Sequence, residues 1–224
     1  MSTFYNRTRR STSIPRKLVR ERKAYLIPIY FMLLTSGLAS EGIRNSGSYR
    51  FADHIYAGRP QGRFFIGVLL DRLLLSLPSA RAFRSRYLYA KEEIRRLVQD
   101  TSATSPELAI LAVPSGCARE LFEVAEELRA SDPSAYSRIR WHGLDLDDGL
   151  IDSLARRSRE EGHQMSFWTG DALSEGAYRS TYDMVISMGF TEFLDDDVAI
   201  GFYRIVHEHL KPGGRFVTSG LRRH

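Results

Sequence analysis

The sequence predicts an α/β fold in which a doubly wound, mostly parallel sheet follows an N-terminal helical region. Three observations predict it. Short apolar runs of strand length alternate with amphipathic helical segments over residues 107–220. Within them, residues 108–149 form a strand–helix–strand pattern that ends in an acidic tip. The first 100 residues contain long apolar and basic stretches with helical spacing instead.

The chain begins with a basic segment. Residues 1–23 carry eight Lys and Arg against Glu21 alone, a net charge of +7, so the other residues carry −2 of the total +5. We expect this segment to be a mobile tail, and the basic balance belongs to it rather than to the folded body. The single cysteine, Cys117, excludes an internal disulfide and indicates a reducing compartment, the cytoplasm.

A strongly apolar run follows at residues 25–38. It contains Pro28 and is shorter than the roughly 20 residues that span a bilayer. We expect a buried helix here. The alternative is contact of residues 16–38 with a membrane surface, because basic residues flank the apolar run.

Residues 41–63 are rich in glycine and predict a loop or a broken helix. Loops that concentrate polar and aromatic side chains often form sites, and this one carries Tyr49, Arg50, Asp53, His54 and Tyr56. Residues 64–98 predict helices interrupted at Pro78. Residues 24–100 are therefore expected to form a helical cap, joined by a polar linker at 102–106 to a ligand-binding domain over 107–224.

The strand–helix–strand unit starts with a strand at residues 109–113, and the turn Pro114-Ser115-Gly116 ends that strand. The next helix has one apolar face, formed by Leu121, Val124, Ala125 and Leu128. The second strand covers residues 139–144 and is followed by Asp145. A carboxylate at this place can accept hydrogen bonds from the hydroxyls of a ribose. A turn with a single glycine does not suit a diphosphate.

The alternation then continues to the end of the chain. Asp147 or Asp148 can cap a helix, strands follow at 165–168 and 182–187, and Asp195 can cap another helix. The segment Lys211-Pro212-Gly213-Gly214 is expected to end that helix before a fifth strand at 215–219. Ligands of such sheets bind beyond the carboxyl ends of the strands.

Four segments of this region together resemble the class I S-adenosylmethionine-dependent methyltransferases, which have a Rossmann-like fold. They are GLDLDD (143–148), GDAL (170–173), YDMVISMGFTEFLDDD (182–197) and LKPGGRFV (210–217). The upstream segment YRFADHIYAGRPQGR (49–63) is similar to the Tyr-Arg segment of a group of bacterial methyltransferases. The main resemblance covers about half of the chain, residues 107–220.

The resemblance implies S-adenosyl-L-methionine as cofactor. By position, the backbone at Val113, Pro114, Ser115 and Gly116 would face its methionine part. Asp145, followed by Leu146, would take the ribose hydroxyls, and Asp171 with the Ala172 amide would read the adenine. The floor beside the transferred methyl would comprise Ser187, Met188 and Gly189.

The sequence also departs from the family pattern. Ala112 stands at the place of an acidic residue, and Pro114 and Ala118 stand where the family has glycines. The family sheet has seven strands, whereas five are predicted here, so the last two are expected to be missing. An unpaired fifth strand invites association with a second copy or a partner.

The resemblance implies methyl transfer by in-line displacement, which depends mostly on positioning. A small-molecule or lipid-like acceptor is expected. A neutral hydroxyl acceptor would need a base, for which His54, Tyr49 and Glu192 are candidates. The tetrapeptide typical of amino methylation on bases is absent at 187–190, so no DNA substrate is expected, and the spacing of the histidines predicts no metal.

Two other functions stay open on the sequence alone. The departures at the first turn are compatible with a non-catalytic, methyltransferase-like interaction module. The basic tail is compatible with an RNA methyltransferase, which would require RNA binding that falls steeply with salt.

Overall fold

The computed structural model describes residues 14–44, 49–101 and 107–220. Residues 1–13 of the predicted tail and the predicted linker at 102–106 lie outside the described residues. The chain divides into two compact units, residues 1–85 and residues 86–224. This division falls inside one long helix, so the second half of that helix belongs to the unit that contains the sheet.

The first unit is helical. It contains the helices α1 (Ile14–Arg20), η2 (Ala24–Leu26), α2 (Ile27–Leu33), α3 (Gly37–Arg44), α4 (Tyr49–Ala57) and α5 (Phe64–Ser76), and the start of α6 (Pro78–Asp100). The break between α5 and α6 lies at Leu77, directly before Pro78, as the sequence predicts. Residues 41–63, predicted as a loop or a broken helix, contain the end of α3 and the regular helix α4. Helix α4 forms because its apolar residues Phe51 and Ile55, four apart, pack into the core of this unit.

The predicted buried helix at residues 25–38 is wrong in two respects. The segment is broken into η2, α2 and the start of α3, with Pro28 in the first turn of α2, where proline fits. Much of it is also exposed, since Tyr25 and Phe31 keep 72% and 57% of their surface accessible. Burial begins only at Ser36 and Leu38.

A buried carboxylate organises the first unit. Asp71 of α5 is fully buried and accepts hydrogen bonds from Ser36 Oγ (2.5 Å) and from the backbone N–H groups of Leu38 (3.1 Å) and Gln61 (2.7 Å). The side chain of His54 contributes a fourth neighbour, with Nε2 3.8 Å from Asp71 Oδ2. One side chain thus ties α3, α4 and the segment before α5 together.

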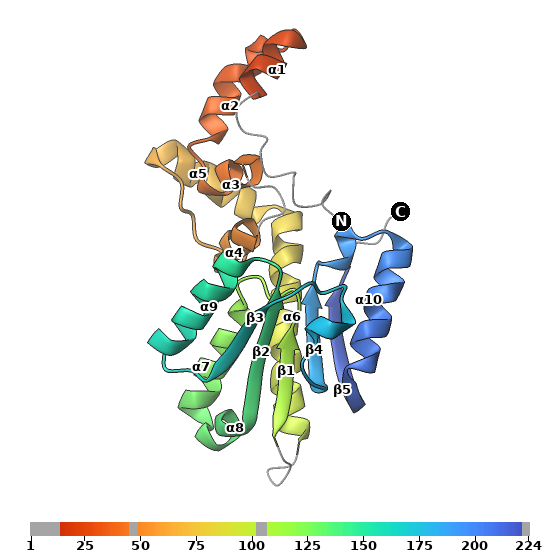
Figure 1. The fold of residues 1–224 in the computed structure, drawn as a ribbon. Helices are drawn as coiled ribbons and strands as arrows, with labels where there is room; N and C mark the ends of the chain where they lie inside the picture. Colours follow the sequence, from red (N-terminus) through yellow and green to blue (C-terminus); the bar gives the residue numbers. More distant parts are fainter. Residues whose placement is uncertain (1–13, 45–48, 102–106, 221–224) are drawn as a thin grey trace. The chain divides into compact units, whose positions relative to one another are not determined.

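The second unit contains a parallel sheet, which confirms the predicted fold class (Figure 1). Its strands are β1 (Leu108–Ala112), β2 (Ile139–Asp145), β3 (Met165–Thr169), β4 (Tyr182–Met188) and β5 (Leu210–Ser219). Their order is β3-β2-β1-β4-β5, and all four pairings are parallel. The chain reverses its winding between β1 and β4, so the switch point of this doubly wound sheet lies at the end of β1.

Helices follow the strands at the predicted places. They are α7 (Arg119–Ser131), α8 (Pro133–Arg138), α9 (Asp148–Glu160) and α10 (Asp196–Glu208), with short turns η3 (Glu175–Ala177) and η4 (Thr191–Phe193). Asp147 caps α9 through a hydrogen bond from Leu150 N, as predicted. Asp195 occupies the N-cap of α10 but makes no side-chain cap bond. Helix α8 is not anticipated; Asp132 caps it and Pro133 occupies its first turn.

Strand β5 starts earlier than predicted. It begins at Leu210, and its register against β4 shifts between Tyr182 and Met184, so residues 211–214 form an irregularity within the strand. Gly213 has a φ of +77°, which glycine adopts without strain. Among the described residues β5 pairs with β4 alone, and the association predicted through this edge stays a prediction.

Within the part of the chain that the structure describes, no single helix is long and apolar enough to cross a membrane. One bent pair, Ala24–Leu33 with Gly37–Arg44, passes by length and composition alone.

Candidate functional site

The parallel pairing brings the predicted cofactor residues to one edge of the sheet. Residue Asp145 ends β2, Met188 ends β4, and the turn 113–116 follows β1 directly. Asp171 comes two residues after β3. Because parallel strands end on the same side, these segments share the carboxyl edge at the switch point, where ligands of such sheets bind.

The turn after β1 is anchored on both sides. Val113 N donates to Ile186 O of β4, and Ser115 N donates to Leu144 O of β2, both at 2.8 Å. Gly116 then adopts a φ of +48°, which a side chain would strain. These two bonds hold the turn between the two neighbours of β1.

The residue before α7 shows the cost of the departure from the glycine pattern. Ala118 has φ +46° and ψ +32°, the left-handed conformation, and serves as the N-cap of α7 without a side-chain bond. An L-residue pays about 1–2 kcal/mol for this conformation. The backbone thus keeps the path that a glycine allows, although the sequence has alanine.

Asp145 connects the turn to the tip of β2. Its Oδ2 accepts a hydrogen bond from Gly116 N (2.9 Å), and its Oδ1 accepts one from Asp147 N (3.2 Å). Asp145 is buried, with only 8% of its surface accessible. Burial raises the pKa of the Asp145 carboxyl, and the backbone N–H groups of Gly116 and Asp147 oppose that rise. A carboxylate offers about four acceptor positions, so these two bonds leave capacity for a ligand hydroxyl.

Gly143 lets the turn after β1 pack closely against β2. A Cβ on Gly143 would lie 2.5 Å from Phe167 Cδ1 and 3.1 Å from Ser115 Cβ. Any larger residue at position 143 would push the turn away from β2. Gly143 is one of the residues that sequence reasoning did not single out, although it opens the GLDLDD segment.

The loop after β3 is fixed by its own side chains. Asp171 is half-buried and accepts from Leu173 N at 2.9 Å. The hydroxyl of Tyr178 donates to Ala172 O at 2.9 Å, and Trp168 Nε1 donates to Ala177 O at 2.9 Å. These bonds hold Asp171 and Ala172 in one conformation without using the Asp171 carboxylate fully.

The end of β4 is closely covered. Ser187 is fully buried, and its Oγ has no hydrogen-bond partner among the described residues. Gly189 follows with a φ of +72°, and a Cβ there would lie 2.7 Å from Nη1 of Arg86. The guanidinium of Arg86 therefore lies directly against the backbone at the end of β4.

Arg86 also pairs with one of the predicted catalytic candidates. Its Nη1 lies 2.8 Å from Glu192 Oε1, and the two side chains are 14% and 9% exposed. The pair joins α6 to η4 across 106 residues of sequence. Sequence reasoning missed Arg86, because nothing local distinguishes it from the other arginines of α6.

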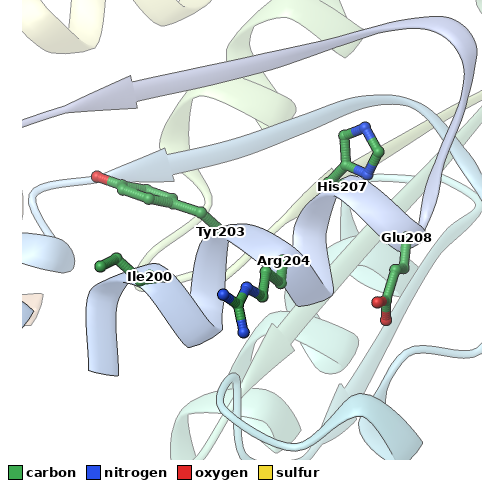
Figure 2. Close-up of a pocket in the computed structure, with 5 residues that line it drawn as sticks. All are labelled: Ile200, Tyr203, Arg204, His207 and Glu208. Atoms are coloured by element: carbon green, nitrogen blue, oxygen red, sulfur yellow. The ribbon is translucent and has the colours of Figure 1, made fainter. Parts of the chain in front are cut away.

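A shallow depression of about 370 Å³ begins beside this pair. Its lining consists of Thr191, Glu192, Asp196, Ala199, Ile200, Tyr203 and Gly220. A second depression of about 270 Å³ shares Ile200 and Tyr203 and continues along α10 (Figure 2). Figure 2 shows Arg204, His207 and Glu208 on the following turns of that helix. The first depression lies between η4, α10 and Gly220, which follows β5, whereas the second runs along the surface of α10.

The other two catalytic candidates belong to the first unit. Tyr49 and His54 lie on α4. His54 is buried, with its Nε2 turned toward Asp71, and Tyr49 is half-buried and accepts a long hydrogen bond from Arg50 Nε (3.4 Å). Their contacts are those of a helix packed within this unit, and their catalytic role stays a prediction.

The described residues contain no group of three or more His, Cys, Asp or Glu that could hold a metal ion. The predicted absence of a metal stays a prediction.

Comparisons with known proteins bear on the same half of the chain. Residues 111–214 match the model of a family described as a methyltransferase domain. No curated protein sequence matches the chain.

Several solved structures are similar. One is an S-adenosylmethionine-dependent methyltransferase from Clostridium acetobutylicum, with 17% identity and a TM-score of 0.45 over 60% of this chain and 49% of that one. Another is magnesium protoporphyrin IX methyltransferase from Synechocystis with bound SAH, with 15% identity, a TM-score of 0.45, and 60% and 56% of the two chains covered. A third is a TehB-like S-adenosylmethionine-dependent methyltransferase from Corynebacterium glutamicum, with 22% identity, a TM-score of 0.41, and 55% and 59% covered. The matched part thus spans between about half and three fifths of these proteins.

Proposed function

We propose that this chain, whose residues 111–214 match the methyltransferase-domain family model, is a class I S-adenosylmethionine-dependent methyltransferase that transfers a methyl group from S-adenosylmethionine to a small-molecule or lipid-like acceptor. When bound, this cofactor supplies a methyl group already activated on a sulfonium sulfur. The protein then has to hold donor and acceptor in line, which can supply up to ~7–11 kcal/mol.

The observation that supports the proposal best is the position of the Asp145 carboxyl. It lies at the switch point, 8% exposed, and is held by Gly116 N from one strand end and Asp147 N from its own. A fixed carboxylate with acceptor capacity can take ribose hydroxyls without reorganising. Ser115 and Gly116, held in place by the same contacts, would face the methionine part.

The remaining contacts would come from the neighbouring strand ends. Asp171 and the Ala172 amide would bind the adenine, next to Leu146, which is 50% exposed beside Asp145. Ser187, Met188 and Gly189 would line the floor near the sulfur. The Ser187 hydroxyl, buried without a partner, keeps a donor for a ligand or an ordered water there.

The depression beside Glu192 is where we place the acceptor. Its lining combines the carboxylates of Glu192 and Asp196 with the hydroxyl of Thr191 and the exposed apolar surface of Ile200 and Tyr203. A carboxylate in this depression can accept the proton of a hydroxyl acceptor. Of the three candidate bases, Glu192 is the one that belongs to the same unit as the proposed cofactor residues.

A second candidate function rests on the turn after β1. Ala112 replaces the family's acid, and Ala118 holds a left-handed conformation that glycine would adopt freely. A domain that has lost cofactor binding could keep this fold as an interaction module. Cofactor affinity separates the two functions.

The test is calorimetric titration of S-adenosylhomocysteine into the full chain and into Asp145→Ala, Asp171→Ala and Asp152→Ala. We expect saturable binding, weakened by about 1–3 kcal/mol in each of the first two variants, because polar ligand groups lose their partners. Asp152, an exposed carboxylate on α9, is the matched control and should change nothing. Absence of binding to the folded wild-type chain would refute the enzymatic proposal. Circular dichroism checks that the Asp145→Ala variant is still folded.

A further inference from the structure

Helix α5 exposes apolar side chains on the side opposite to its buried residues. The buried side carries Gly67, Asp71 and Leu75. Each position two residues away lies about 200° around a helix, and there Phe65, Leu69 and Leu73 are 80%, 54% and 60% exposed. A helix at the surface of a globular protein normally carries polar residues on its outer side. We call Phe65, Leu69 and Leu73 the outer row of α5.

The helix α2 packs against α5 and exposes apolar side chains as well. Ile29, Phe31 and Met32 are 46%, 57% and 40% exposed. Single exposed apolar residues are ordinary, but several on two neighbouring helices mark a surface that contacts something else.

The charge of this unit is strongly one-sided. Residues 14–85 contain twelve Lys and Arg against four Asp and Glu, a net charge of +8. Of the four acids only Glu21 is exposed, and Asp71 is fully buried among its own donors. Residues 86–224 carry a net charge of −6. The positive charge is thus concentrated in the unit that exposes the outer row.

Basic side chains accompany the apolar ones. Arg63 precedes α5, Arg72 lies between Leu69 and Leu73 in the sequence, and both are exposed. Helix α1 and the residues after it add an exposed cluster, which consists of Arg16, Lys17, Arg20, Arg22 and Lys23. Long basic side chains can keep their charge at a polar boundary while their stems lie along apolar surface.

We propose that the first unit docks on an anionic lipid surface, with the outer row of α5 inserted at the boundary of the acyl chains and the basic side chains against the headgroups. Burial of apolar area and attraction of basic side chains to anionic lipid both strengthen such binding. RNA would match the charge but leaves exposed Phe and Leu without a role. A second copy of the unit would match the apolar row but brings +8 against +8. The inference does not rest on the proposed methyl transfer.

The experiment is flotation of the full chain with vesicles of phosphatidylcholine, with and without phosphatidylglycerol. The variant Phe65→Ser/Leu69→Ser/Leu73→Ser removes the outer row, and Leu88→Ser/Tyr89→Ser removes two comparably exposed residues of α6 (58% and 53%) as a matched control. All five side chains are exposed, so thermal denaturation should show both variants folded.

We expect flotation only with phosphatidylglycerol, weaker at high salt, and reduced about tenfold or more in the outer-row variant but not in the control. Absence of flotation with anionic vesicles, or flotation that the outer-row variant retains, would overturn the proposal. So would a dimer of the wild-type chain that dissociates in the outer-row variant. Salt-sensitive binding of polyuridylate that the outer-row variant retains, together with an absence of vesicle binding, would also overturn it. Titration of S-adenosylhomocysteine into the outer-row variant should be unchanged, which separates this inference from the proposed function.

Discussion

The carboxylate of Asp145 accepts a 2.9 Å hydrogen bond from the backbone N–H of Gly116, a residue 29 positions earlier in the chain. This bond joins the turn after β1 to the tip of β2 at the switch point of the sheet. The turn contains one glycine, with Pro114 and Ala118 on either side of it, and the carboxylate fixes its conformation. The residues predicted to hold the cofactor are therefore built around a contact that exists before any ligand arrives.

The glutamate that follows this turn predicts a pH-dependent stability. Burial raises the pKa of Glu120 to about 7, well above the ordinary value near 4.3 for an unfolded chain. The folded state therefore favours the protonated form of Glu120. The loss of folding stability caused by burying its ionised form is absent below about pH 4 and grows as the pH rises toward 7. We expect Glu120→Gln to stabilise the protein above pH 7 by about 1–3 kcal/mol, after allowance for its partial exposure.

Urea denaturation at several pH values between 4 and 8 measures the difference in the free energy of unfolding between wild type and Glu120→Gln. Glu160→Gln, at an exposed position on α9, is the control and should leave stability unchanged throughout. A difference in the free energy of unfolding between wild type and Glu120→Gln that stays constant with pH would contradict a raised pKa of Glu120.

The strained alanine before α7 predicts an unusual response to glycine. Ala118→Gly relieves about 1–2 kcal/mol of strain from the left-handed backbone conformation. It also removes a buried methyl group and raises the conformational entropy of the unfolded chain, and both changes destabilise the fold. We therefore expect the free energy of unfolding to change by no more than about 1 kcal/mol. Ala125→Gly, equally buried but in the regular part of α7, lacks the compensation and should cost about 2 kcal/mol. Equal losses in the two variants, measured by denaturation, would show that position 118 carries no strain.

The pair between Arg86 and Glu192 is expected to contribute more than other ion pairs of the same helix. Arg86→Ala would leave a carboxylate that is only 9% exposed without this partner, at a cost of about 2–4 kcal/mol. Arg96→Ala removes a guanidinium that is 53% exposed and lies 2.9 Å from Glu93. This variant should lose less than about 1 kcal/mol of folding stability. Thermal denaturation of both variants measures the difference, and similar losses would argue against a structural role for the Arg86 pair.

The buried carboxylate of the first unit predicts acid sensitivity. Burial tends to raise the pKa of Asp71, but hydrogen bonds from Ser36 and from the backbone of Gln61 and Leu38 outweigh it and hold that pKa below its usual value. Its stabilisation is therefore present above about pH 4 and is lost as the pH falls through the lowered pKa.

Removing that carboxylate should open the first unit. We expect Asp71→Ala to cost about 3–5 kcal/mol, since buried donors lose their acceptor, and to speed amide exchange of residues 36–75. Glu21→Ala, which removes only exposed pairs with Lys17 and Lys23, is the control. Unchanged exchange in Asp71→Ala would show that the carboxylate does not organise this unit.

The sheet could be predicted from the sequence because short runs of strand length with an apolar centre alternate with amphipathic helical segments. Leu108–Ala112 is wholly apolar, and Tyr182–Met188 has the apolar centre Met184–Ile186, as expected for strands buried on both faces. Strand β5 was harder, since Pro212 and Gly213 suggest a reversal when they in fact form an irregularity inside the strand.

The first unit shows where hydrophobicity alone misleads. The apolar run at residues 25–38 predicts burial, but apolar composition does not distinguish a core from an exposed contact surface, and Tyr25 and Phe31 are exposed. Arg86 could not be found either, because its partner Glu192 is 106 residues away and their meeting depends on tertiary structure.

Binding of S-adenosylmethionine at the carboxyl edge of the sheet can be measured by hydrogen–deuterium exchange of the full chain with and without saturating S-adenosylhomocysteine. We expect slower exchange in four segments, residues 113–117, 145–147, 171–173 and 187–190, and unchanged exchange in helix α9. Exchange that stays at the ligand-free rate in these segments, or slows only elsewhere, would contradict it.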